Sequence, residues 1–244
     1  MKRVLLVLCA AAFAAVLTVP AWAGTNPDAV FALHAKAHTT KATTICTTWS
    51  PNTEGIPCSN YVSNAAVGVN TDVYLVVARG NSDTGIAGLS CGVLYDNVDA
   101  SGVDVFGWYL CGDLEFTNAG ADGEWPISGG GNRITWSFVD ACQLTVLGTD
   151  GVHAVAGAFY VYAYSPDVLY ITPNNNLQSE PELAVADCTA DTDYLPFGRA
   201  GFVTFSTSGS DLGCNPCTEP DTDCLGVPVE DSTWGKIKSK YGSN

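Results

Sequence analysis

Hydrophobic and polar residues alternate along much of this chain with the two-residue period that is typical of β-strands. The first clear example lies at residues 31–38, where Phe31 and Leu33 alternate with His34 and Lys36. Successive side chains of a strand point to opposite faces, so this pattern predicts a strand with one apolar and one polar face. Further strands, separated by residues that favour turns, are predicted at residues 73–78, 86–95, 105–116, 133–138, 153–164, 168–172, 182–188 and 201–206.

The spacing of these strands predicts the fold class. No segment between residues 40 and 225 carries a sustained apolar stripe with the 3.6-residue period of a helix. About ten short strands with turn residues between them are typical of a sandwich or a barrel. We predict an all-β protein with an antiparallel β-sandwich over residues 24–207.

The chain beyond the predicted sandwich has a different composition. Residues 208–229 are polar and contain cysteines, which predicts an irregular linker held by disulfides. Residues 230–244 form a basic tail, in which Ser232 can cap a short terminal helix. One face of that helix would carry Trp234, Ile237 and Tyr241. Because the tail is both amphipathic and basic, we interpret it as a transfer or anchoring signal.

The first 23 residues have the organisation of a secretory signal peptide. A basic start is followed by an uncharged run at residues 4–19 and then by small residues up to Ala23. This order predicts cleavage after Ala23 and a secreted or cell-surface, extracytoplasmic location. An uncleaved anchor stays open as an alternative, since residues 4–23 are just long enough to span a bilayer. A lipid anchor on Cys9 is disfavoured by the bulky leucine before it, and no later segment is long and apolar enough to cross a membrane.

The charged residues exclude one class of function. The chain has 10 Lys and Arg against 25 Asp and Glu, a formal net charge of −15. Between residues 42 and 235 the only cations are Arg79, Arg133 and Arg199. Nucleic-acid binding depends on cations that replace the counterions of the phosphates, so a nucleic-acid partner is excluded. An anionic membrane surface is disfavoured for the same reason.

Cysteine usage supports an extracytoplasmic location. Nine cysteines lie after residue 23, and export to an oxidising compartment favours disulfides. Sequence alone does not determine their connectivity. Pairing of neighbours predicts the bonds Cys46–Cys58, Cys91–Cys111 and Cys142–Cys188. Three cysteines remain near the C-terminus, at Cys214, Cys217 and Cys224. They lack the fourth ligand that a zinc site needs, so we expect one disulfide and one thiol that is free or pairs between chains.

Candidate catalytic groups are few. His34 and His38 share the polar face of the first predicted strand, which we expect to be exposed. Residues four apart on a strand lie about 13 Å from each other, too far to share a metal. No Ser, Cys or His motif of hydrolase type is present. Asp113, Glu115 and Glu124 could supply the two carboxylates of a glycosidase, but such neighbours arise by chance in an acidic chain.

Asp96, Asp99 and Asp104 concentrate oxygen donors in one loop and are the candidates for a metal site. Calcium accepts carboxylates and carbonyls without strict spacing. The segment lacks the spacing of an EF-hand loop, and a solvated turn rich in Asp and Asn accounts for the same residues. We therefore predict no cofactor, with calcium as the one ion to consider.

Tyr160, Tyr162 and Tyr164 share one face of a predicted strand, while Phe159 and Val161 occupy the other face. If the tyrosine face is open, three rings in a row would make a stacking platform for a sugar or a polymer. Central strands of a sandwich often bury aromatic side chains on both faces, so ordinary packing is the alternative interpretation.

Two stretches of the chain resemble known proteins. From Thr71 to Tyr95, a strand leads through Gly85-Ile86-Ala87-Gly88 to a second strand, an arrangement similar to the opening of cohesin-type sandwiches. The segments at 31–38, 131–136 and 157–164 and the ending at 232–238 resemble a group of uncharacterised secreted bacterial proteins. In that group a β-sandwich is followed by a Cys-containing linker and a T-W-G-x-I-K tail, which implies the same order here.

These observations together favour a secreted, non-enzymatic β-sandwich that acts as a binding or structural module at the cell surface. A glycan or another surface protein is the expected partner. The alternative is a secreted, carboxylate-dependent glycan-active enzyme.

Overall fold

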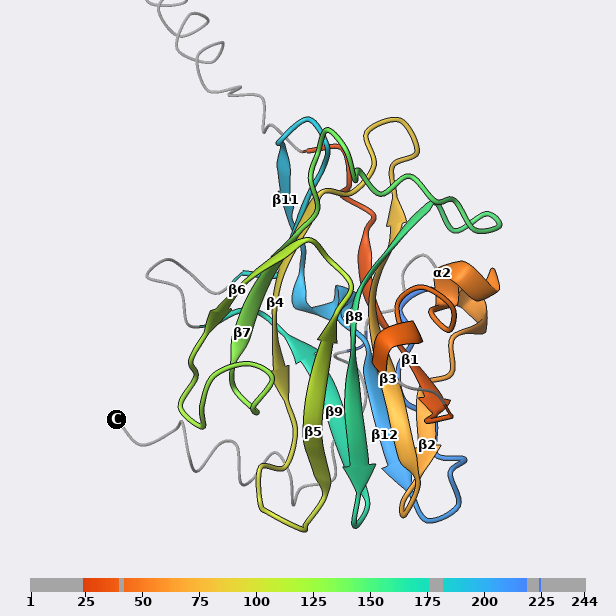
Figure 1. The fold of residues 1–244 in the computed structure, drawn as a ribbon, viewed down its shortest axis with the longest axis vertical. Helices are drawn as coiled ribbons and strands as arrows, with labels where there is room; N and C mark the ends of the chain where they lie inside the picture. Colours follow the sequence, from red (N-terminus) through yellow and green to blue (C-terminus); the bar gives the residue numbers. More distant parts are fainter. Residues whose placement is uncertain (1–23, 40–41, 176–181, 219–223, 225–244) are drawn as a thin grey trace, which may run out of the picture.

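The computed structural model describes residues 24–39, 42–175, 182–218 and 224 of the 244-residue chain. The expected signal peptide and the basic tail lie outside the described residues. Two β-sheets pack face to face, and the only α-helix in the described ranges is α2 (Pro51–Glu54) (Figure 1). No helix of these ranges is long and apolar enough to cross a bilayer. The predicted all-β sandwich is confirmed.

One sheet has four strands, all antiparallel to their neighbours. Their order across the sheet is β1 (Val30–Ala37), β3 (Asn70–Gly80), β8 (Val152–Ala163) and β5 (Val103–Leu110). Long β3 and β8 form the middle of this sheet, and β1 and β5 form its edges.

The other sheet has eight shorter strands and is antiparallel except where β12 meets β2. A path of six strands runs through β11 (Thr192–Tyr194), β10 (Ala184–Ala186), β4 (Gly88–Leu94), β9 (Asp167–Thr172), β12 (Phe202–Ser206) and β2 (Asn64–Ala66). On the far side of β4 the sheet continues through β7 (Gly131–Thr135) to β6 (Leu114–Asn118).

The main core lies between the two sheets and follows from the alternation in the sequence. Phe31, Leu75 and Phe159 from the four-stranded sheet meet Val93 and Phe205 from the other, and all five are fully buried. Burial of a side chain of this size contributes roughly 1.5–3 kcal/mol to folding. The apolar side chains of each strand therefore determine which of its two faces points into the core.

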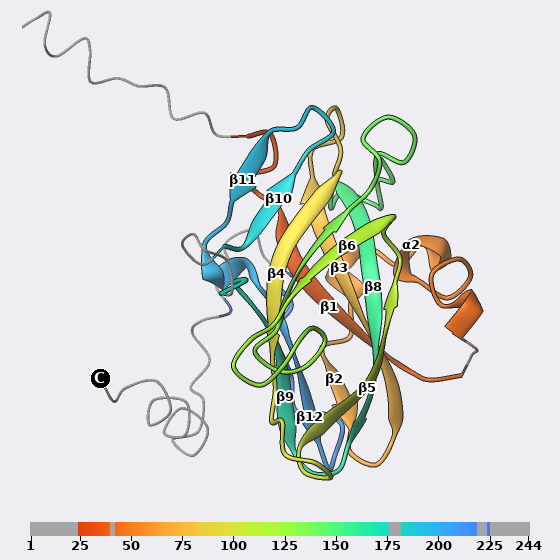
Figure 2. The same cartoon turned by 60° about the vertical axis from the view of Figure 1, so that its left-hand side comes forward.

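A second cluster covers part of the opposite, outer face of the four-stranded sheet. There Tyr74 and Val76 of β3 pack under Ile45 and Tyr61. The covering residues belong to an irregular segment at 42–63, which we call the cap. Figure 2 shows α2, part of the cap, on the side of this sheet that faces away from the eight-stranded sheet.

The helix in the cap has clear start and stop signals. The Ser50 side chain accepts a hydrogen bond from the Thr53 amide at 3.4 Å. Pro51 occupies the first turn, where its missing N–H costs no hydrogen bond, because the first amides of a helix have no partner within the helix. Gly55 ends the helix with φ 69°, a conformation that favours glycine.

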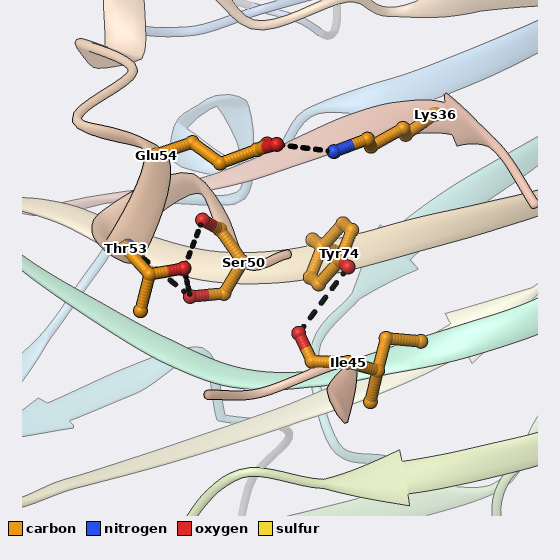
Figure 3. Close-up of polar contacts among 6 residues, drawn as sticks. All are labelled: Lys36, Ile45, Ser50, Thr53, Glu54 and Tyr74. Atoms are coloured by element: carbon orange, nitrogen blue, oxygen red, sulfur yellow. Dashed lines mark hydrogen bonds and ion pairs between the residues drawn. The ribbon is translucent and has the colours of Figure 1, made fainter. Parts of the chain in front are cut away.

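Side-chain contacts attach the cap to the sheet below it (Figure 3). The Tyr74 hydroxyl donates to the Ile45 carbonyl at 3.3 Å, and Lys36 Nζ lies 2.5 Å from Glu54 Oε1. The Lys36–Glu54 pair lies at the surface and is worth less than about 1 kcal/mol. The apolar contacts and the disulfides therefore hold the cap in place.

Most predicted strands are present, but the prediction of one continuous strand at 105–116 is wrong. The chain there forms β5 in one sheet and β6 in the other. Gly112 makes the crossing, and a Cβ at this position would lie 2.5 Å from Ile134 Cγ2. Only glycine passes so close to the neighbouring strand. The short strands β2 and β11 were not predicted.

Four disulfides join described cysteines: Cys46–Cys111, Cys58–Cys217, Cys142–Cys188 and Cys214–Cys224. Of the three bonds expected from neighbour pairing, Cys142–Cys188 is present, and Cys46–Cys58 and Cys91–Cys111 are wrong. Cys91 faces the main core, whereas Cys111 packs with the cluster under the cap, so the four-stranded sheet separates them. The cap is instead tied to the body at two points. Four disulfides fit formation in an oxidising compartment.

The unpaired thiol belongs to the core and not to the C-terminal trio. Cys91 is the free cysteine and is fully buried, and burial raises the pKa of its thiol far above the usual range. We expect no reaction with a thiol reagent in the native chain from residue 24, and one reactive thiol after denaturation. A fast native reaction, or more than one thiol in guanidinium, would contradict the assigned bonds.

The first part of the expected linker packs against the sandwich. Cys214 forms a β-bridge with Phe202, and the Asn215 side-chain amide donates to the Cys58 carbonyl at 2.8 Å. Cys217 is bonded to Cys58. Residues 213–217 are therefore structurally continuous with the body of the protein.

Candidate functional site

The cap leaves part of the outer face of the four-stranded sheet uncovered. An open depression of about 440 Å³ lies there, lined by Asn70, Phe106, Tyr160, Tyr162 and Tyr164. We call these five residues the aromatic groove. The side chains of Phe106 and Tyr164 are 57% and 46% exposed, and Tyr160 and Tyr162 are half-buried. The three tyrosines predicted to share a face do share it, and the face is open.

The alternation of β8 places its tyrosines in this groove. Phe159 and Val161 point into the main core, so the residues after them must point outward. In the antiparallel register Tyr162 stands between Asn70 of β3 and Asp104 of β5. The groove therefore lies across the two central strands, β3 and β8, and the edge strand β5.

A β-bulge in β5 adds the fourth ring. The pairing of β5 with β8 shifts between Val105 and Gly107, so Phe106 has no partner in the register. A bulge of this kind redirects a side chain. The Phe106 ring centroid lies 6.2 Å from that of Tyr160, and the Tyr162 and Tyr164 centroids are 4.7 Å apart. No motif marks Phe106 in the sequence, because its place depends on the bulge.

An aspartate and a histidine lie beside the groove. His38 Nδ1 lies 2.9 and 3.0 Å from the two carboxylate oxygens of Asp72, and the imidazole packs 4.7 Å from the Tyr160 ring. Asp72 is buried; burial raises the pKa of its carboxyl, and the hydrogen bond from His38 opposes that shift. The pair fixes the imidazole against Tyr160 and so holds that ring in position.

The polar groups of the groove are free to bind a ligand. Within the described residues, the hydroxyls of Tyr160, Tyr162 and Tyr164 and the side-chain amide of Asn70 have no hydrogen-bond partner. Each hydroxyl and the carboxamide can both donate and accept. The groove thus combines four apolar ring surfaces with four neutral, unused polar groups.

The other sequence candidates do not form a comparable site. In the part of the chain that the structure describes, no three or more His, Cys, Asp or Glu side chains gather closely enough to hold a metal ion. Asp96, Asp99 and Asp104 do not belong to any such group, and calcium at these residues stays a prediction. Asp104 accepts from the Ala100 amide at 3.1 Å, which closes the turn.

The carboxylates considered for glycan hydrolysis already have protein partners. Glu115 Oε2 accepts from Trp108 Nε1 at 3.0 Å and from the Asn132 side chain at 2.8 Å. The hydroxyl of Thr117 donates to Glu124. Asp113, the last residue before β6, accepts from the Ser137 amide at 2.7 Å.

His34 is buried beneath the cap, so its expected exposure is wrong. Its Nδ1 accepts a hydrogen bond from the Val62 amide at 3.0 Å. His153 is also buried and shares a 3.0 Å hydrogen bond with the Tyr61 hydroxyl. Burial lowers the pKa of both imidazoles to about 4, so both are neutral at pH 7. The cap, unseen in the sequence pattern, causes the difference.

These two histidines make stability depend on pH. The unfolded chain binds their protons near pH 6.5, but the folded chain does so only near pH 4. Stability is therefore full above about pH 6.5 and falls as the pH drops towards 4, by up to about 3 kcal/mol for each histidine. Thermal unfolding between pH 7.5 and 4.5 measures this. In the variant His34→Gln/His153→Gln the melting temperature should fall less steeply as the pH is lowered. An equally steep fall would contradict the role given to the two histidines.

Comparisons with known proteins give no family. No protein family and no curated protein matches the chain. Three solved structures are similar to it, and all are cohesin modules. One, from a family 33 glycoside hydrolase of Clostridium perfringens, has a TM-score of 0.38 at 13% identity over 72% of this chain and 97% of its own.

The other two come from Acetivibrio cellulolyticus. The sixth cohesin of its scaffoldin B, in complex with a dockerin mutant, has a TM-score of 0.36 at 13% identity, over 59% of this chain and 93% of its own. A type II cohesin domain from its cellulosome has a TM-score of 0.37 at 11% identity, over 61% and 92%. Cohesins are also the sandwiches that the sequence from Thr71 to Tyr95 resembles. The second resemblance, to proteins with a T-W-G-x-I-K tail, has no counterpart among these matches.

Proposed function

We propose that this chain is an extracellular, non-catalytic binding module that holds its ligand in the aromatic groove. The observation that carries the proposal is the open face of β8, where three tyrosines point outward beside Phe106. An exposed apolar surface costs free energy, and clusters of such rings mark interaction sites. The groove is also rimmed by unused polar groups, which give a ligand its orientation.

The scaffold is suited to binding. Tyr160 and Tyr162 stand on the central strand β8, Tyr164 directly follows its last residue, and the His38–Asp72 pair supports Tyr160 from the side. Groups held in this way lose little conformational entropy when a ligand binds. The disulfides fit a protein that must keep this geometry outside the cell.

The enzyme alternative receives no comparable support. Asp113, Glu115 and Glu124 are each engaged by a donor from the protein, and none of them lines the groove. Exposed apolar residues also occur outside the groove, for example Leu114 and Phe116 on β6, which are 60% and 58% exposed.

A matched pair of variants tests the proposal. Phe106 and Phe116 are the same residue type with nearly equal exposure, 57% and 58%, on different sheets. The chain from residue 24 is screened against arrays of neutral oligosaccharides, acidic oligosaccharides and peptides, beside the variants Phe106→Ala and Phe116→Ala. We expect at least one bound class, weakened by Phe106→Ala and retained by Phe116→Ala. Retention of every bound class by Phe106→Ala, or the reverse selectivity, would overturn the proposal.

A further inference from the structure

The chemistry of the aromatic groove also restricts what can occupy it. We infer that the ligand is an uncharged carbohydrate chain, an inference that rests on the proposed function of the groove. Its lining consists of four rings, three phenol hydroxyls and one carboxamide, and none of these groups is charged.

Charge excludes an anionic ligand. Two aspartates flank the groove, with Asp72 opposite Tyr160 and Asp104 opposite Tyr162 in the strand register. The two basic groups near this end of the groove already have acidic partners, since Lys36 is paired with Glu54 at 2.5 Å and the His38 imidazole with Asp72 at 2.9 Å. The whole chain carries a formal net charge of −15. An acidic glycan would meet repulsion with no compensating cation in the lining.

The flanking carboxylates are not arranged for a cationic ligand. Both oxygens of Asp72 face His38 Nδ1, at 2.9 and 3.0 Å, and Asp104 accepts from a backbone amide. A cation site needs a carboxylate that is free to pair with it or a set of rings that enclose it. Here the rings line an open depression, and neither aspartate belongs to the lining.

The hydrogen-bonding groups suit a sugar better than a peptide. Tyrosine hydroxyls and the Asn70 carboxamide donate and accept, and sugar hydroxyls do the same. A proline-rich peptide, which also docks in aromatic grooves, offers carbonyl acceptors but few donors. It would leave the acceptor capacity of Asn70 and of the hydroxyls unused. A sugar ring further presents a face of C–H groups, which packs on an aromatic ring.

The shape indicates a chain and not a single sugar. Tyr160, Tyr162 and Tyr164 follow one another at intervals of two residues, so their Cα atoms span about 13 Å, and the ring centroids of Tyr162 and Tyr164 lie 4.7 Å apart. The depression is open to solvent, and Tyr164 at one end of the row is 46% exposed, so a chain can extend past that end. Successive sugar units would then pack on successive rings.

Native gels that contain a polysaccharide test this inference. We use the chain from residue 24 with soluble neutral polysaccharides of glucose, xylose or mannose, with polygalacturonate, and in a separate titration with a proline-rich peptide. We expect retardation by at least one neutral polysaccharide. The retardation should change little between about 0.05 and 0.5 M NaCl, because a neutral ligand forms no ion pair with the protein.

Two variants of one residue separate the ring from its hydroxyl. Tyr162→Ala should weaken the affinity roughly tenfold, and Tyr162→Phe by about threefold, because the ring stays and one hydrogen bond is lost. Phe116→Ala should leave the affinity unchanged, and unfolding curves check that each variant is folded.

The outcomes distinguish the two claims. Binding only to polygalacturonate or only to the peptide, with loss in Tyr162→Ala, overturns the carbohydrate inference and leaves the proposed function standing. Absence of binding to every neutral polysaccharide also overturns the inference. Neutral-polysaccharide binding that Tyr162→Ala fully retains overturns both, because the ligand then lies elsewhere.

Discussion

Replacing Tyr160 and Tyr162 together with alanine is expected to weaken ligand binding by roughly 50-fold or more, while the protein stays folded. Each ring that packs against a ligand contributes about 0.5–1.5 kcal/mol beyond the area it buries. The free energy of unfolding should fall by only about 1–2 kcal/mol, because both rings are half exposed and neither belongs to a buried cluster. Titration calorimetry with the ligand found by the array measures the first effect, and urea unfolding measures the second.

Tyr194 provides the control for this double variant. It lies on β11 in the other sheet with its side chain 72% exposed, outside the aromatic groove. Tyr194→Ala should bind the ligand as the unaltered protein does. Unchanged affinity of the Tyr160→Ala/Tyr162→Ala variant would remove the basis of the proposed function.

The largest effect on stability is expected from the bond that ties the cap to the C-terminal segment. Cys58–Cys217 joins residues 159 apart, and the chain-entropy relation gives about 5 kcal/mol for a loop of that length. Cys58→Ser/Cys217→Ser should therefore lose about 4–5 kcal/mol of unfolding free energy, a large part of the total for a domain of this kind. Urea denaturation of the oxidised proteins measures the loss.

A second disulfide offers a matched comparison in the same region. Cys214–Cys224 closes a separation of only 10 residues, for which the same relation gives about 2–3 kcal/mol. Cys214→Ser/Cys224→Ser should thus be the milder variant. If this variant lost as much unfolding free energy as Cys58→Ser/Cys217→Ser, or more, the Cys58–Cys217 bond would not be the main covalent stabiliser of the cap.

Local patterns predicted the parts of the structure that depend on local physics. The alternation around β1 and β8 indicated both strands and, for β8, which residues point together. The side chains of a strand alternate between its two faces whichever strand it pairs with. The sequence alone therefore predicted that Tyr160, Tyr162 and Tyr164 share a face. Whether their face is open could not be predicted in this way, because that depends on how far the cap extends.

The failures all involve contacts between distant segments. His34 has the sequence context of an exposed polar position, but the cap covers it and the Val62 amide of the cap donates a hydrogen bond to it. Cys91 and Cys111 are near neighbours among the cysteines, yet they lie on opposite faces of a sheet. The break between β5 and β6 depends on the close approach of Gly112 to Ile134. None of these contacts leaves a periodic signal.

The most direct test of the binding site observes the tyrosine rings during a ligand titration. Nuclear magnetic resonance of ring-labelled tyrosines separates the groove from the rest of the protein, since Tyr74 and Tyr95 are buried and Tyr194 lies on the other sheet. We predict that the resonances of Tyr160, Tyr162 and Tyr164 shift with increasing ligand concentration while that of Tyr194 does not change. Saturable binding that moves the Tyr194 resonance and leaves the three groove tyrosines unchanged would contradict it.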